Sequence, residues 1–115
     1  ERRLRPLAES EGIDLVLECD VTRDDHLERV FADLMEHWSS LDVLVHAVAF
    51  APREELKGRF SETSRAGFAI ALEVSTYSLV ALSRAARPLL ERRQGSILTL
   101  TYIGSKVAMP NYNVM

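Results

Sequence analysis

Three short segments of the chain are mainly apolar, at residues 13–21, 41–50 and 96–102. Continuous rather than alternating hydrophobicity over such lengths predicts strands that are buried on both faces, as in a parallel sheet. Pro52 follows the second segment and cannot donate a hydrogen bond to a central strand, so this strand should end before it.

Between these segments, apolar residues recur every three or four positions, the spacing of amphipathic helices. The pattern predicts a helix over residues 22–38, with Thr22 and Asp25 as its N-terminal capping signal. A longer helix is expected over residues 64–90, with apolar side chains around much of its surface. Two further helices are expected, one over residues 4–11 stopped by Gly12 at its C′ position and one opening at residues 110–115.

Helices and strands therefore alternate along the chain, an order that builds βαβ units and a parallel sheet with helices on both faces. The expected fold class is α/β, a three-layer, Rossmann-like, doubly wound parallel sheet, here partial, with the central strands and helices only. We expect residues 1–115 to form a single partial domain.

Composition narrows the function classes. The net charge of −3 and pI near 5.6 give no electrostatic reason to expect nucleic acid or an anionic membrane as partner. Ser75, Thr76 and Ser78 interrupt the longest apolar stretch, so no membrane span is expected. The lone Cys19 cannot form an internal disulfide and favours a reduced, cytoplasmic setting. No metal site is expected.

Ligands of doubly wound sheets bind beyond the carboxyl ends of the strands, which here directs attention to two tyrosines. Tyr102 ends the third predicted strand, and Tyr112 follows ten residues later at the expected helix start. A phenol is a poor acid at neutral pH unless a nearby cation stabilises its phenolate. Lys106 fits a Tyr-x-x-x-Lys spacing from Tyr102, but a strand and Gly104 separate the two, so we expect a solvent-exposed loop lysine.

Several strings in this context resemble the enoyl-acyl-carrier-protein reductases of the short-chain dehydrogenase superfamily. They are Thr99-Leu100-Thr101-Tyr102-Ile103-Gly104, Pro110-Asn111-Tyr112-Asn113-Val114-Met115, Cys19-Asp20-Val21 and Val45-His46-Ala47-Val48-Ala49-Phe50-Ala51-Pro52. The resemblance implies hydride transfer from NADH, with NADPH left open, to a trans-2-enoyl thioester carried on acyl carrier protein in type II fatty acid synthesis. It also implies a homotetramer.

By the same resemblance, Tyr112 hydrogen-bonds the thioester carbonyl and Tyr102 is the second active-site tyrosine. Asp20 and Val21 match positions that flank the adenine of the cofactor. The resemblance places further cofactor contacts at Ala47, Val48, Ala49, Leu100 and Thr101, and substrate contacts at Ala49, Phe50, Ala51, Leu56, Tyr102, Tyr112 and Met115. His46 is expected to be a hydrogen-bonded core residue, although histidine is a residue type that often serves in catalysis.

Parts of the family pattern are missing or altered. Many members have Ser and Gly where this chain has Ala47 and Ala49, which weakens the match at that turn. The N-terminal glycine-rich strand-turn-helix that binds pyrophosphate, the catalytic lysine and the C-terminal part of the domain are expected outside this segment, which alone should be inactive and poorly stable. Two alternatives stay open: a short-chain alcohol or ketone dehydrogenase, and a non-catalytic Rossmann-like assembly module.

Overall fold

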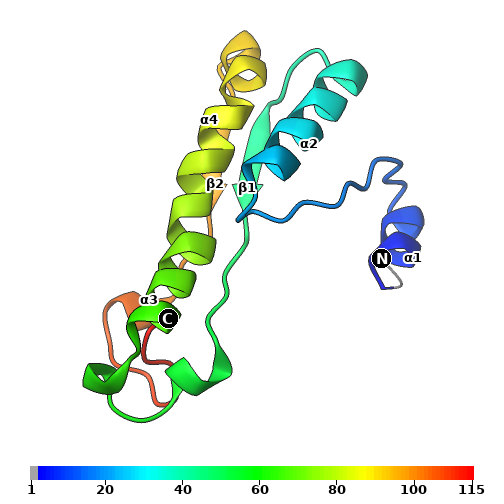
Figure 1. Cartoon of the computed structure of the whole chain (residues 1–115). Coiled ribbons are helices and arrows are strands. Elements are labelled where there is room, and N and C mark those ends of the chain that lie inside the picture. Colours follow the sequence, from blue (N-terminus) through cyan, green and yellow to red (C-terminus); the bar gives the residue numbers. More distant parts are fainter. Residues whose placement is uncertain (1–2) are drawn as a thin grey trace.

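The computed structural model describes residues 3–115, whose helices and strands are shown in Figure 1. The α-helices are α1 (Leu4–Ser10), α2 (Asp24–His37), α3 (Arg65–Leu72) and α4 (Ser78–Leu90), and the strands are β1 (Val43–His46) and β2 (Ser96–Thr99). Short 3-10 turns are η1 (Arg53–Leu56), η2 (Phe60–Glu62), η4 (Glu91–Arg93) and η5 (Ile103–Ser105), and η3 (Glu73–Tyr77) is a π-helical turn.

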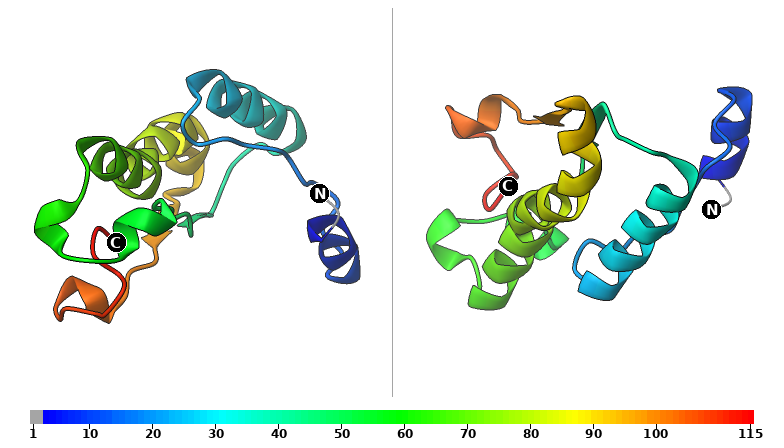
Figure 2. Two further views of the ribbon diagram at one scale, coloured as in Figure 1. Left: turned by 60° about the horizontal axis from the view of Figure 1, so that its bottom comes forward. Right: turned by 90° about the horizontal axis from the view of Figure 1, so that it is seen from above.

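The two strands pair in parallel, with Val43 opposite Ser96 and His46 opposite Thr99. The chain leaves β1, passes through α3 and α4 and returns to β2, which is the βαβ connection that a parallel pair requires. α4 lies against both strands and α2 packs beside α4, whereas α1 stands apart in Figure 1 and in the left view of Figure 2. The parallel pairing predicted from the continuous apolar runs is therefore confirmed.

The hydrophobic core lies between α2, α4 and the sheet. Its buried members are Phe31 of α2 and Ala86, Leu89 and Leu90 of α4. On the opposite face of the sheet, the side chains of Val43 and Val45 remain 53% exposed. Within residues 3–115, helices thus cover one face of the two-stranded sheet, and the second helical layer of the expected arrangement is not present.

The predicted strand at residues 13–21 does not form among the described residues. This segment is extended without ladder hydrogen bonds and links α1 to the start of α2, away from the two paired strands (Figure 1). A strand is held by hydrogen bonds to a neighbouring strand, and none lies beside this segment. Leu15, Val16 and Leu17 are only half-buried, so the apolar run that suggested a strand lacks a partner to bury it.

The end of α1 agrees with the sequence prediction, whereas the start of α2 does not. Gly12, with a left-handed φ of 68°, follows α1 and donates a hydrogen bond to the carbonyl of Glu9, as expected of a C′ glycine. The capping prediction for α2 is wrong: the helix starts at Asp24, after Arg23, without a side-chain cap. Thr22 instead donates its N–H and hydroxyl to the Asp20 carboxylate, at 3.0 and 2.8 Å.

The predicted helix over residues 64–90 forms almost as expected. Ser64 caps it by accepting a hydrogen bond from the Gly67 N–H, and the π turn η3 joins α3 to α4 without a break. The continuous helix Arg65–Arg93 has a window of mean hydropathy 1.4 and, by length and composition alone, could span a bilayer, contrary to the sequence expectation. Core helices of water-soluble proteins share this property, and α4 contacts both strands.

Residues 110–115 do not open a helix. Asn111 has a left-handed φ of 56°, and the segment consists of turns and bends. The Asn113 side-chain amide donates hydrogen bonds to the carbonyls of Lys57 and Gly58, at 2.8 and 2.9 Å. These hydrogen bonds join two segments that are distant in the sequence. They hold residues 110–115 against the segment after η1, where the sequence predicted the start of a helix.

Candidate active site

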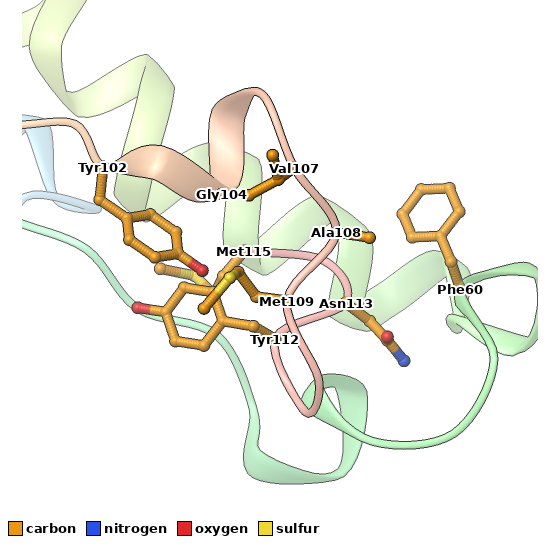
Figure 3. A pocket seen from close by; sticks show the side chains of 9 residues that line it. All are labelled: Phe60, Tyr102, Gly104, Val107, Ala108, Met109, Tyr112, Asn113 and Met115. Atoms are coloured by element: carbon orange, nitrogen blue, oxygen red, sulfur yellow. The ribbon is translucent and has the colours of Figure 1, made fainter.

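Tyr102 and Tyr112 come together as the sequence predicted. Tyr102 follows β2 and Tyr112 lies in the C-terminal turns, and their rings meet edge to face with centroids 4.9 Å apart and an interplanar angle of 62° (Figure 3). Both residues are 39% exposed, and both line cavities. Two phenols therefore lie at one place beyond the carboxyl end of β2.

The orientation of Tyr102 depends on Gly104. A β-carbon at Gly104 would lie 2.2 Å from Cε1 and 2.5 Å from the hydroxyl oxygen of Tyr102, so the ring occupies the space of the missing side chain. The 3-10 turn η5 closes with a hydrogen bond from the Ser105 N–H to the Tyr102 carbonyl. Partial desolvation raises the pKa of Tyr102, and the charge of Tyr112 raises it further. Tyr102 is thus a neutral phenol at neutral pH and can donate a hydrogen bond.

Two cavities adjoin this pair of tyrosines. The first, about 220 Å³, extends from the tyrosines toward Phe60 (Figure 3). The second, about 370 Å³, lies between the tyrosines, the segment after β1 and the π turn η3. Residues lining the second cavity are Val48, Ala49, Ser75, Thr76, Leu100, Thr101, Tyr102, Tyr112 and Met115.

Most of the predicted contacts around the tyrosines are gathered in the second cavity. Val48 and Ala49 follow β1, and Leu100 and Thr101 follow β2, so the parallel pairing brings both strand exits to the same edge. Met115 lines both cavities. The small side chain of Ala49 leaves its backbone open to a flat ligand ring.

Other predicted residues lie outside the two cavity linings. Ala51 is buried and Phe50 is exposed. The carbonyl of Leu56 accepts a hydrogen bond from the Asn113 N–H, at 3.5 Å. Ala47 immediately precedes the lining residues without being one of them. The substrate and cofactor roles of these residues stay predictions.

Asp20 and Val21, the predicted adenine contacts, lie just before α2. The pKa of Asp20 is lowered, mainly by the backbone hydrogen bond from Thr22 and next by the Thr22 hydroxyl. One carboxylate oxygen is therefore already engaged within its own turn. The second oxygen is the one that could accept from a ligand amine, and this role also stays a prediction.

His46 is a hydrogen-bonded core residue, as expected. Its side chain is 3% exposed, with Nε2 2.7 Å from the Ser78 hydroxyl and Nδ1 3.2 Å from the Thr99 hydroxyl. Ser78 donates its single hydroxyl proton to the Val74 carbonyl, at 2.6 Å. With that proton engaged, the Ser78 oxygen can accept a hydrogen bond from His46 Nε2. The imidazole thus ties β1, β2 and α4 together.

Lys106 is not paired with Tyr102 on a helical face. Tyr102 has extended backbone angles (φ −148°, ψ 172°), and Lys106 comes after the η5 turn, exposed to solvent. Ser75 is a cavity residue that was not among the predicted site residues. Its hydroxyl accepts a hydrogen bond from the Phe50 N–H and donates one to the Phe50 carbonyl, both at 3.1 Å. The three hydroxyl residues that interrupt the apolar helix were the only signal of this contact.

Comparison with known proteins identifies the family. A family model described as enoyl-(acyl carrier protein) reductase matches residues 1–115. The chain belongs to this family. It is 49% identical, over its whole length, to the NADH-dependent enoyl-acyl-carrier-protein reductases FabI of Aquifex aeolicus and Neisseria meningitidis, of which it covers 43% and 44%. The chain thus spans less than half the length of these curated relatives.

Solved structures of this family agree with the fold. The Aquifex aeolicus enoyl-acyl-carrier-protein reductase superposes with a TM-score of 0.95 at 48% identity, covering 99% of this chain and 45% of that chain. The Anaplasma phagocytophilum enzyme, solved in complex with NAD, gives 0.94 at 44% identity, covering 99% and 43%. The chain therefore has the Rossmann-like α/β fold of these enzymes and contributes a part of it.

Proposed function

We propose that the full-length protein reduces trans-2-enoyl thioesters carried on acyl carrier protein to saturated acyl thioesters, with NADH as hydride donor, in fatty acid biosynthesis. The observation that carries the proposal is the Tyr102–Tyr112 pair at the junction of two cavities, in a chain of the enoyl-(acyl carrier protein) reductase family. Relatives 49% identical to this chain are named as NADH-dependent enzymes of this activity.

The cofactor would occupy the cavity beside the strand exits. Val48 and Ala49 form one wall and Leu100 and Thr101 another, so small or apolar groups surround a space of about 370 Å³ that suits one flat ring of a dinucleotide. When bound there, the reduced nicotinamide supplies a hydride to the β-carbon of the enoyl group. The Thr101 hydroxyl and the nearby backbone groups provide polar contacts for its orientation.

Tyr112 would act on the thioester. As the hydride arrives at the β-carbon, the electron pair of the double bond moves toward the carbonyl oxygen, and a hydrogen bond from the Tyr112 hydroxyl stabilises the enolate oxygen. A proton then adds to the α-carbon, which completes the saturated product. Tyr102, a neutral phenol packed against Tyr112, holds that ring in place and borders the same cavity.

We also propose that the protein is a cytoplasmic homotetramer. The α3–α4 helix exposes large apolar side chains that the described residues leave uncovered, at Phe68, Leu72, Tyr77 and Val80. Burial of these side chains between copies of the chain would remove them from solvent. Light scattering on the full-length protein measures the oligomeric state, and a monomer would overturn this part of the proposal.

The activity is tested with the full-length protein and crotonyl thioester, following the absorbance of the reduced nicotinamide with NADH and, separately, NADPH. We expect a crotonyl-dependent rate with NADH. Simple ketones serve as the comparison substrate, since a rate with ketones alone would indicate an alcohol or ketone dehydrogenase. No rate with either substrate would indicate a non-catalytic module and would overturn the proposal.

A further inference from the structure

The π turn η3 places one hydroxyl group against the backbone of the segment that leaves β1. Ser75, within Glu73–Tyr77, accepts a hydrogen bond from the Phe50 N–H and donates one to the Phe50 carbonyl. A serine hydroxyl has one proton and two lone pairs, so a single side chain can satisfy both backbone groups of one residue. π turns within α-helices are frequent at functional sites.

This contact fixes a segment that has no other regular support. Residues 47–50 follow β1 and carry no strand ladder, so the Ser75 hydroxyl takes the place of a neighbouring strand at Phe50. Ser75 also lines the second cavity, together with Val48 and Ala49 on one side and Tyr102 and Tyr112 on the other. The distance between the β1 exit and the tyrosines therefore depends on this serine.

The helix itself is anchored at the same place. Ser78, the first residue of α4, is fully buried and bound by His46 of β1, and its hydroxyl donates to the Val74 carbonyl. The π turn is thus tied to β1 through Ser78 and to the β1 exit through Ser75. Ser75 therefore projects from a rigid base, which a positioning group requires.

We propose that Ser75 is a positioning residue for the enoyl reduction proposed above, on which this inference rests. By holding the Phe50 backbone, it keeps residues 48–50 at the distance from the tyrosines at which cofactor and enoyl group meet in reactive geometry. Ser75 acts through Phe50 and not on the substrate itself, so its loss should affect the reacting geometry more than the binding of substrate.

The test uses the full-length enzyme with Ser75→Ala, Ser75→Thr and, as matched control, Ser83→Ala. Ser83 lies on the same helix, and its hydroxyl donates only to the Leu79 carbonyl one turn earlier. We expect Ser75→Ala to lower kcat by about tenfold with a smaller change in KM, because two hydrogen bonds to the Phe50 backbone, which follows the cavity residues Val48 and Ala49, are lost. Ser75→Thr keeps the hydroxyl and should restore most of kcat, while Ser83→Ala should leave it unchanged.

Hydrogen exchange of the Phe50 amide gives a second measurement that does not depend on catalysis. Ser75→Ala removes the acceptor of this amide and should speed its exchange, whereas Ser83→Ala should not. A wild-type kcat in Ser75→Ala, or equal losses in Ser75→Ala and Ser83→Ala, would overturn the positioning role while leaving the proposed function in place. Absence of an enoyl-dependent rate in the wild-type enzyme would overturn both.

Discussion

Gly104 leaves no space beside the Tyr102 ring for a single methyl group, which makes Gly104→Ala a defined perturbation of the candidate active site. A β-carbon there would lie 2.2 Å from Cε1 of Tyr102. Because carbon atoms pack at about 3.5 Å, the ring would have to move by about 1.3 Å. Gly104 does not have the left-handed φ of Gly12 or Gly58, so alanine fits its backbone and the effect is steric.

The size of the effect follows from where the ring can go. Tyr102 is partly exposed and can turn toward solvent, so the stability cost should be near the lower end for added core volume, about 1 kcal/mol. The edge contact with Tyr112 would be lost with this movement. Displacement of a catalytic-site group by roughly 1 Å can cost about 100-fold in rate, so we expect kcat/KM to fall between about 10-fold and 100-fold.

A double-mutant cycle in the full-length enzyme isolates the clash. Gly104→Ala is measured in the wild-type background and in Tyr102→Ala, by enoyl-dependent oxidation of NADH and by thermal unfolding. Without the ring, alanine at residue 104 has nothing to displace and should change neither kcat/KM nor Tm. Equal losses in both backgrounds would refute the argument that Gly104 acts through Tyr102.

Three further predictions concern Tyr112, His46 and Glu55. Tyr112→Phe should lower kcat of the full-length enzyme with little change in NADH affinity measured by fluorescence, and an unchanged kcat would remove Tyr112 from the proposed role. His46→Ala should lower the free energy of unfolding by about 3 kcal/mol, because it leaves a cavity and removes the hydrogen bond to the buried Ser78 hydroxyl. A loss below about 1 kcal/mol in denaturant titration would contradict this. Hydrogen bonds from the Ser64 side chain, and next from the Ser64 backbone, lower the pKa of Glu55. The ionised carboxylate therefore stabilises the fold at pH values above its ordinary pKa of 4.5, and this stabilisation is lost as the pH falls through the lowered pKa. Ser64→Ala should therefore raise the Glu55 pKa in an NMR titration and reduce this acid sensitivity, and an unshifted pKa would refute the assignment.

The sequence was sufficient to predict those features that repeat along the chain. The spacing of Leu27 and Phe31 marks the buried side of α2, and the continuous apolar runs locate β1 and β2. The position of Tyr102 also followed, because it comes just after β2, at the carboxyl end of the sheet. Each of these depends on local pattern and on a general rule of topology.

Other features depend on contacts between distant residues, which no local pattern contains. The run at residues 13–21 is apolar enough for a strand, but a strand also needs a neighbour, and the described residues supply none. Thr22 is a residue type that often caps helices, yet here its N–H donates a hydrogen bond to the Asp20 carboxylate. The hydropathy of a serine is the same in a π turn and in an α-helix. The sequence pattern therefore does not reveal that Ser75 contacts Phe50.

The parallel pairing of β1 and β2 has a consequence for the order of folding. His46 and Thr99, which meet across this pair, are separated by 53 residues, so the chain between them must be closed into a loop before the strands can bond. The helical turns between the two strands form from neighbouring residues, and they shorten the chain distance that separates the strands before they pair. Folding should therefore show helical circular dichroism early and amide protection of β1 late, with the His46 hydrogen bonds closing last.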